Sequence, residues 1–160
     1  MNFSIRRAKH EDAEGIIIAH VSSIRNICSK DYTPAQIEAW AGRKFRAELW
    51  CQTIDRDFVW IIELEGKILG FGHLALMSEE LGEIMGLYLI PPAIGKGLAK
   101  ALFAELLKTC QDNRLKKIHL HATITAKSFY ETLGFYQSGS DDTIKMQGVA
   151  IPCFPMELII

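Results

Sequence analysis

The chain has 160 residues, of which 49% are hydrophobic and 23% charged, so it is long enough for one globular domain and is not a disordered chain. Its net charge of -1 excludes the basic surface that is typical of nucleic-acid-binding proteins. No apolar run approaches a membrane span, and the N-terminus lacks an apolar signal core. We therefore expect a single cytoplasmic domain over residues 1–160 that binds neither nucleic acid nor membrane.

The first third of the sequence predicts one strand followed by helices. Apolar and polar residues alternate over residues 2–7, which is typical of a strand, and helical spacing follows over residues 12–27. Thr33 and Pro34 then form an N-cap and a first helical position, which predicts a helix over residues 34–41. A further helical segment is expected over residues 44–51.

From Phe58 the patterns change to those of a sheet with two intervening helices. The predicted strands cover residues 58–64, 68–77, 81–90, 117–123, 135–138 and 150–160, and the helices cover residues 98–112 and 125–133. Gly134 is the expected end of the second helix, and residues 138–142 are expected to form a polar loop. The order β-α-α-β-β-β-α-β-α-β-β predicts an α/β (α+β) domain with a mixed sheet.

The loop that joins the strand over residues 81–90 to the helix over residues 98–112 has the features of an anion site. Its sequence is Ile94-Gly95-Lys96-Gly97-Leu98-Ala99. The first turn of a helix leaves backbone N–H groups without partners, and glycines allow a phosphate to approach them closely. The spacing matches neither a Walker loop nor a dinucleotide fingerprint. On these residues alone, a tight turn without a ligand explains the glycines equally well.

Two motifs together make the chain resemble the GNAT superfamily of acetyl-CoA-dependent N-acetyltransferases. The loop is similar to the family signature Gln/Arg-x-x-Gly-x-Gly/Ala at Gly97 and Ala99, although Ile94 stands where Gln or Arg is usual. The run Ala126-Lys127-Ser128-Phe129-Tyr130-Glu131-Thr132-Leu133-Gly134-Phe135 is similar to the second signature. The resemblance covers nearly the whole chain. It implies a largely antiparallel central sheet flanked by helices and acetyl-CoA as the co-substrate.

The resemblance also implies where acetyl-CoA binds. In this family the third central strand and its neighbour diverge, and the pantetheine arm pairs with the exposed strand edge. That edge corresponds here to Leu87, Tyr88 and Leu89, whose N–H groups would hold the thioester carbonyl and its developing oxyanion. The pyrophosphate would lie on the loop, with charge added by two lysines; the implied set is Ile94, Gly95, Lys96, Gly97, Leu98, Ala99 and Lys100.

The implied catalytic residues are a tyrosine and a glutamate. Tyr130 would be the general acid toward the departing thiolate, because an ordinary tyrosine with a pKa of about 10 keeps its proton at neutral pH. Glu83 matches the position of the catalytic base in some family members. The alternatives are that Tyr130 is a core aromatic, that Glu83 is an exposed strand-end carboxylate, and that His73 relays the proton.

The acceptor pocket is expected from the variable helical region and the neighbouring strands. Its candidate residues are Tyr32, Trp40, Trp60, Tyr88 and His73, although Trp40 fits a core position equally well. An aromatic pocket suits an amine-bearing small molecule or a peptide end. His119 and His121 alternate on one strand, but because no carboxylate joins them in the sequence we expect no metal site.

Three functions remain open at the level of sequence. The first is an N-acetyltransferase that moves the acetyl group of acetyl-CoA to a primary amine. The second is a non-catalytic CoA-binding sensor or interaction module, which Ile94 favours and which Tyr130 and Glu83 oppose. The third is an acyltransferase with a longer acyl donor. The closing strands are also a candidate surface for a homodimer.

Overall fold

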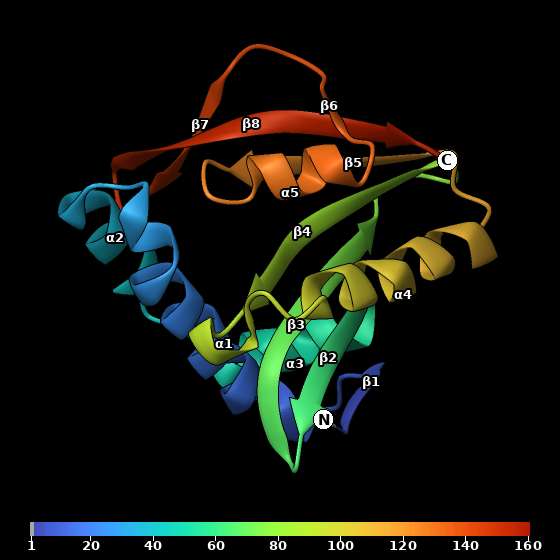
Figure 1. Ribbon diagram of the computed structural model, residues 1–160, viewed down its shortest axis with the longest axis horizontal. Coiled ribbons are helices and arrows are strands. Elements are labelled where there is room, and N and C mark those ends of the chain that lie inside the picture. The colour runs from blue at the N-terminus through green and yellow to red at the C-terminus, as the bar shows by residue number, and fades with distance from the viewer. Residues whose placement is uncertain (1) are drawn as a thin grey trace.

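The computed structural model describes residues 2–160 and contains one eight-stranded mixed sheet with helices on both faces (Figure 1). The strand order is β1-β2-β3-β4-β5-β8-β6, and β7 pairs with β8. The pairing of β4 with β5 is parallel and the other pairings are antiparallel. The strands are β1 (Phe3–Arg7), β2 (Phe58–Leu64), β3 (Lys67–Leu76), β4 (Leu81–Leu89), β5 (Lys117–Thr123), β6 (Tyr136–Gln137), β7 (Asp142–Met146) and β8 (Val149–Ile159).

The five α-helices form two groups that cover opposite faces of the sheet (Figure 1). Phe71 and Gly72 are adjacent on β3 and therefore point to opposite faces. Phe71 packs with Ile16 and Ile54 of the first group, whereas Gly72 lies against Leu106 of the second group. The first group is α1 (Ala13–Asn26), α2 (Pro34–Ala41) and α3 (Ala47–Arg56), and the second is α4 (Leu98–Asp112) and α5 (Lys127–Thr132).

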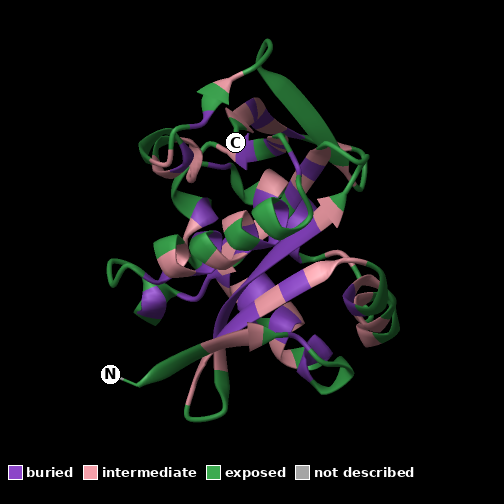
Figure 2. Ribbon diagram, turned by 90° about the vertical axis from the view of Figure 1, so that its right-hand side faces the viewer, coloured by how far each residue is buried: buried purple, intermediate pink, exposed green. Residues whose placement is uncertain are grey.

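Buried residues are concentrated in the middle of the sheet and on the helix faces that contact it, whereas the turns and outer strands are exposed (Figure 2). The largest cluster joins Leu74 and Ile84 of the central strands to Leu106 of α4 and Tyr130 of α5. Burial of such apolar side chains stabilises the fold by about 1.5–3 kcal/mol each. This core therefore holds α4 against the sheet, and with it the loop that precedes α4.

The sheet forks between β4 and β5, and this fork is the feature that positions the site. The two strands pair only from Leu81 to Ile84, opposite residues 117–120, although both strands continue beyond that point. On its other edge β4 carries a bulge, because His73 pairs with Gly86 and Leu74 pairs with Ile84, which leaves Met85 without a partner on β3. A bulge bends its strand. Figure 1 shows β4 running away from β5 and β8.

Several predicted elements have the bounds expected from sequence. Thr33 caps α2 by accepting a hydrogen bond from the Gln36 N–H at 3.2 Å, and α2, α4, β2 and β5 begin and end at the predicted residues. The third helix was predicted over residues 44–51 but covers Ala47–Arg56, because Trp50 and Ile54 set its packed face. Within residues 2–160 no helix is long and apolar enough to cross a membrane.

The polar loop predicted over residues 138–142 is shorter in the structure, because β7 begins at Asp142. β7 pairs with β8 through the turn around Gly148, whose φ of 79° lies in the left-handed region. Its first four residues are exposed. An edge strand that is exposed on both faces lacks the hydrophobic alternation by which strands are recognised in a sequence.

Candidate active site at the fork of the sheet

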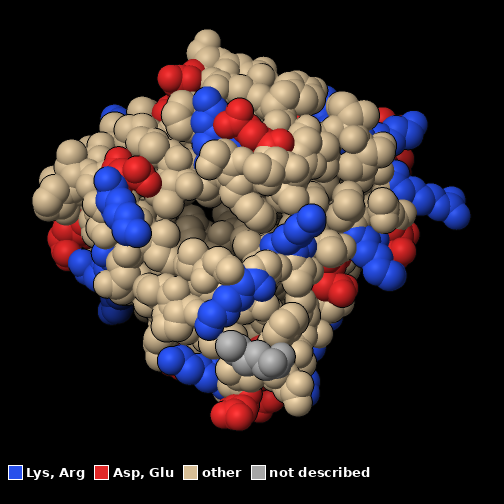
Figure 3. Space-filling view, viewed as in Figure 1, with Lys and Arg blue, Asp and Glu red and all other residues tan. Residues whose placement is uncertain are grey.

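A cavity of about 450 Å³ lies between the fork and the N-terminus of α4, and we call it the loop cavity. It opens on the face covered by α4 and α5, which Figure 3 shows hollowed, with Lys and Arg side chains around the hollow. Its lining comes from α1, β4, the loop before α4, the end of β5 and α5. The lining residues are Ser23, Ile27, Cys28, Leu87, Tyr88, Leu89, Ile94, Gly95, Gly97, Leu98, Ala99, Lys100, Thr123, Thr125, Ala126 and Phe129.

The loop before α4 has the backbone of an anion cradle. Gly95 and Gly97 have φ of 77° and 75°, and Gly97 is the N-cap of α4. A Cβ on either glycine would meet no atom within 4 Å, so the space beside the loop is open. Within residues 2–160, no N–H from Gly95 to Lys100 has an acceptor. These donors, together with the positive end of the α4 dipole, suit a phosphate group.

Nine of the ten residues predicted for the cofactor line the loop cavity, and Lys96 does not. Lys96 is exposed and lies outside the lining of the cavity. The sequence did not indicate the wall formed by Ser23, Ile27 and Cys28, because these residues follow the helical pattern of α1 and carry no motif. Burial raises the pKa of Cys28 to about 11, so this thiol stays protonated and is not a nucleophile at neutral pH.

A second cavity of about 380 Å³ lies on the opposite face, and we call it the aromatic cavity. It is enclosed by α1, α2, α3 and the segment that precedes α3, by the central strands, and by the β7–β8 hairpin. The lining residues are His20, Tyr32, Trp40, Arg43, Trp50, Phe71, His73, Glu83, Ile84, Met85, Gly86, Tyr88, His121, Thr123, Ile144, Met146, Ile151, Pro152 and Cys153.

Of the five residues predicted for the acceptor pocket, Tyr32, Trp40, His73 and Tyr88 line the aromatic cavity and Trp60 does not. Trp60 points to the opposite face of β2, where its Nε1–H donates a hydrogen bond of 3.2 Å to Thr109 Oγ1 on α4. Its neighbours Val59 and Ile61 face the α1 side, and the alternation of the strand therefore excludes Trp60 from it.

The tryptophan that completes this wall is Trp50, which the sequence analysis did not select. Its ring meets Phe71 at 5.3 Å and His73 at 5.8 Å. Trp50 lies on α3, the helix whose bounds were predicted least well. Tyr32 has a structural role in the same wall, because its hydroxyl donates to the Pro152 carbonyl at 2.7 Å and accepts from the Ile124 N–H at 2.9 Å.

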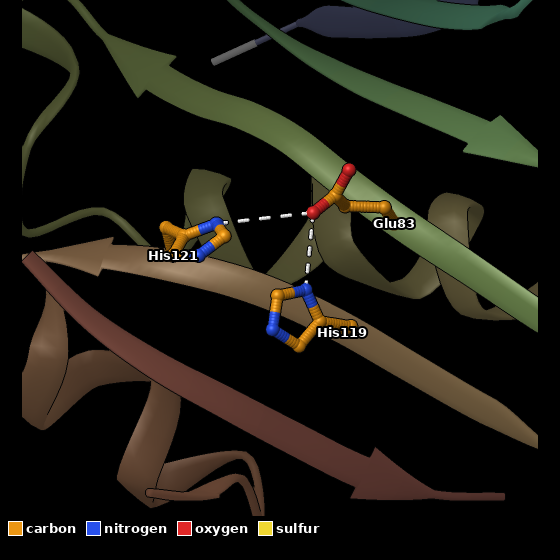
Figure 4. Close-up of side chains that lie close together, drawn as sticks. All are labelled: Glu83, His119 and His121. Atoms are coloured by element: carbon orange, nitrogen blue, oxygen red, sulfur yellow. Dashed lines mark hydrogen bonds and ion pairs between the residues drawn. The ribbon is translucent and has the colours of Figure 1, made fainter. Parts of the chain in front are cut away.

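Glu83 lies in a cluster with His119 and His121 where β4 is still paired with β5 (Figure 4). His119 Nδ1 is 3.0 Å and His121 Nδ1 is 3.8 Å from Glu83 Oε1. The sequence predicts no metal site because no carboxylate lies near these histidines along the chain. In the fold, however, parallel pairing sets Glu83 opposite His119 and brings a carboxylate to them. The donor atoms lie within 4.8 Å of one another, and two histidines with a carboxylate form a set that binds zinc in other proteins.

His73 forms a second carboxylate–histidine pair close to Glu83. Its Nε2 lies 2.7 Å from Asp57 Oδ2, and the Asp57 carboxylate also accepts two hydrogen bonds of 3.1 Å from Arg56. Burial lowers the pKa of His73 more than Asp57 raises it, so the imidazole is neutral at neutral pH. Burial alone would raise the pKa of Asp57, but hydrogen bonds from Arg56 and His73 outweigh that effect and lower it.

Tyr130 is packed in the core behind the fork. Its ring contacts Phe129 and Phe135 at 5.5 Å, and its side chain is 5% exposed. Burial raises its pKa, so the phenol stays protonated. Tyr130 does not line either cavity, whereas Tyr88 lines both.

The two cavities meet at the fork, where Tyr88 and Thr123 line both of them. Residues 28–160 match the family described as Acetyltransferase (GNAT) domain. The chain belongs to this GNAT family. The GNAT chain is 27% identical over 148 residues to the uncharacterized N-acetyltransferase YafP of Escherichia coli (strain K12), across 92% of its own length and 87% of the relative's. It is 32% identical over 82 residues to YjgM of the same organism, across 48% and 49% of the two chains.

Solved structures confirm the GNAT fold that the sequence motifs predicted. A GCN5-related N-acetyltransferase from Rhodopseudomonas palustris superposes with a TM-score of 0.89 at 22% identity, over 100% of this chain and 97% of the other. The PaiA N-acetyltransferase of Thermoplasma acidophilum, solved in complex with coenzyme A, gives 0.83 at 24% identity over 100% of both chains. The predicted family and the largely antiparallel sheet flanked by helices are therefore both confirmed.

Proposed function

We propose that this GNAT domain, as one catalytic unit, transfers the acetyl group of acetyl-CoA to a primary amine of a small molecule or peptide. The observation that carries the proposal is the meeting of the loop cavity and the aromatic cavity at Tyr88 and Thr123. Two reactants that enter from opposite faces would meet there, and such positioning replaces a bimolecular encounter by a directed attack. The Thermoplasma neighbour bound to coenzyme A and a Salmonella typhimurium neighbour bound to acetyl-CoA support the choice of co-substrate.

In this proposal the loop cavity holds acetyl-CoA through its backbone. The N–H groups from Gly95 to Lys100 bind the pyrophosphate, and the Lys100 side chain adds positive charge. The edge of β4 from Leu87 to Leu89, which β5 leaves after Ile84, binds the pantetheine arm and the thioester. The apolar walls at Ile27 and Phe129 exclude water from that arm.

The amine enters the aromatic cavity and loses its proton to Glu83, whose carboxylate is held by His119. The amine nitrogen bonds to the acetyl carbon, the carbon–sulfur bond breaks, and the products are an amide and the free thiol of CoA. A second candidate for the base is His73, because Asp57 fixes its Nε2 and leaves Nδ1 of a neutral imidazole to accept a proton.

Tyr130 is the proposed donor toward the departing sulfur. Burial keeps its phenol protonated, and the second signature motif aligns with it. Tyr88 lines both cavities, whereas Tyr130 lines neither, so Tyr88 is the alternative donor. A hydrogen bond to a developing thiolate is worth about 1.5–3 kcal/mol.

The first experiment measures acetyl-CoA binding by calorimetry in the wild type and in Gly97→Arg. The control is Gly66→Arg, because Gly66 has φ of 80° and also has no atom within 4 Å of an added Cβ, but lies in the β2–β3 turn. Backbone strain is thus common to both variants. We expect Gly97→Arg to lose at least a hundredfold in affinity and Gly66→Arg to keep it. Equal affinities would contradict the proposed cradle.

The second experiment measures release of free thiol from acetyl-CoA with a panel of primary amines. Turnover that depends on the amine supports the transferase. Tight binding of acetyl-CoA without release for any amine would instead favour the non-catalytic CoA-binding module, for which Ile94 is the supporting feature. Faster release from a longer acyl donor than from acetyl-CoA would favour the acyltransferase alternative.

A further inference from the structure

Arg43 is a half-buried cation in the wall of the aromatic cavity that has no carboxylate partner. It lies in the segment between α2 and α3, and its guanidinium stacks 4.6 Å from the centroid of the Phe45 ring. Within residues 2–160 it forms no salt bridge, its Nε is buried without a hydrogen-bond partner, and Nη1 meets only the Met146 sulfur at 3.2 Å. Burial lowers its pKa, which shows that the charge is poorly solvated.

Such a cation is unusual because desolvated charges in folded proteins are normally paired. Arginine has five N–H donors in a planar arrangement that matches a carboxylate, and stacking on Phe45 holds the plane in place. A ligand that brings an anionic oxygen would therefore remove an existing penalty as well as form new hydrogen bonds.

His20 is a second polar group in the same wall without a partner. His20 is 7% exposed, and its ring lines the aromatic cavity, 4.4 Å from the Tyr88 ring and 5.5 Å from the Phe45 ring. Neither ring nitrogen has a hydrogen-bond partner in the part of the chain that the structure describes. Burial and the charge of Arg43 lower its pKa to about 3, so the imidazole is neutral and offers one N–H donor. An anion bound to Arg43 would accept a hydrogen bond from that N–H group.

We propose that the acceptor of this enzyme is an amino acid-like zwitterion, whose carboxylate binds Arg43 and His20 while its amine faces Glu83. The inference rests on the proposed function for the amine, but the carboxylate site stands on its own geometry. Both charges line one cavity: the negative Glu83 lies near the end where β4 still pairs with β5, and the positive Arg43 lies on the side of Tyr88 and His20.

The other residues of the wall indicate what kind of side chain the acceptor has. Trp40, Trp50 and Phe71 present aromatic surface to the same cavity, which favours an apolar or aromatic side chain over a polar one. Arg43 does not serve the phosphates of CoA, because it lines the aromatic cavity and not the loop cavity, where Lys100 is the lining cation.

The test compares acceptors that differ only in the carboxylate. Free-thiol release is measured with phenylalanine against phenylalaninamide, and with 6-aminohexanoic acid against its amide, which together cover two spacings between the amine and the carboxylate. We expect kcat/KM to be about ten- to a hundredfold higher for the acid in at least one pair. In Arg43→Gln we expect that ratio to fall to about one. The matched control is Arg46→Gln, an exposed arginine in the same segment that does not line the cavity, and it should keep the ratio.

Failure of this inference is distinguishable from failure of the proposed function. If acetyl-CoA binds and the amides turn over as well as the acids in the wild type, the transferase stands and the carboxylate site is wrong. An unchanged ratio in Arg43→Gln has the same meaning. If no amine turns over, binding of phenylalanine and its amide is followed by tryptophan fluorescence, since Trp40 and Trp50 line the cavity. Tighter binding of the acid, lost in Arg43→Gln, still supports the site, and equal binding overturns it.

Discussion

The two cavities at the fork are built in different ways, although they share Tyr88 and Thr123. The loop cavity is built largely from consecutive backbone, the run from Leu87 to Lys100, with glycines whose positive φ opens the space. The aromatic cavity is built from side chains of all three helices on its face, five strands and the segment before α3. Backbone donors select a chemical group that is common to many ligands, whereas converging side chains select one particular ligand. The comparison teaches that the co-substrate can be inferred from a motif and the acceptor only from three-dimensional structure.

The largest expected effect is a loss of turnover from a change in the aromatic cavity, with the loop cavity left intact. In Glu83→Gln we expect kcat to fall at least a hundredfold, because the amide cannot accept the proton of the attacking amine, while the affinity for acetyl-CoA stays unchanged. The measurement is free-thiol release together with calorimetry. Glu80→Gln is the control, since Glu80 is exposed and paired with Lys116.

The same experiment decides between the two candidate bases. A large loss in His73→Gln with near-normal turnover in Glu83→Gln would transfer the role to the His73–Asp57 pair. Because burial lowers the pKa of His73, the wild-type kcat/KM would then fall only as the pH drops below about 6.5, the ordinary value for histidine.

The next effect concerns the stability of the wall around His20. Its pKa of about 3 in the folded protein lies below the ordinary value of about 6.5, so the unfolded state binds one more proton between these limits. Stability from this group is therefore complete above pH 6.5 and is lost as the pH falls. Between pH 6.5 and 4.5 we expect the wild type to lose about 2 kcal/mol more unfolding free energy than His20→Phe, measured with urea. Equal losses in the two proteins would contradict a buried neutral imidazole.

Tyr88 at the junction of the two cavities and Tyr130 in the core behind it are the two candidate donors toward the departing sulfur. If Tyr130 assists the departing sulfur, Tyr130→Phe lowers kcat about 10- to 100-fold with little change in acetyl-CoA affinity. Tyr88→Phe should then keep kcat within a few fold. The reverse result would assign the role to Tyr88, whose ring lines both cavities.

The smallest expected effect is on the affinity of the loop cavity for acetyl-CoA. Ile94 lines it and is 50% exposed, at the position where the family usually has Gln or Arg. Ile94→Gln should tighten acetyl-CoA binding about two- to tenfold by adding one hydrogen-bond donor. Ile18→Gln, at a position 68% exposed on α1, is the control and should leave the affinity unchanged. Weaker binding in Ile94→Gln would mean that the apolar side chain itself contacts the ligand.

Much of the fold could be predicted from sequence, because hydrophobic spacing and caps act locally. Thr33 and Pro34 determine where α2 begins, and Gly97 determines where α4 begins, so both were predicted correctly. β7 was not, because its exposed polar residues form a strand only beside β8. The homodimer through the closing strands and the cytoplasmic location stay predictions.

The candidate site was predictable only where a motif lies in one segment. Trp60 was assigned to the acceptor pocket because it is aromatic and close in sequence, but its strand turns it toward Thr109. Trp50, Arg43 and His20 were missed because nothing in their local sequence relates them to one another, and only the packing of α1 and the segment before α3 on the central strands brings them together. The meeting of Glu83 with His119 depends likewise on parallel pairing between distant strands.

The bulge at Met85 changes which residues of β4 point to the same face of the sheet. In a regular strand, residues separated by an odd number of positions point to opposite faces, so Glu83 and Tyr88 would face away from each other. The extra residue reverses that parity, and both side chains enter the aromatic cavity. No substitution within the strand can undo this phase shift, whereas deletion of one residue can. Changes of chain length by a single residue, rather than changes of side chain, therefore decide which residues of β4 face the aromatic cavity.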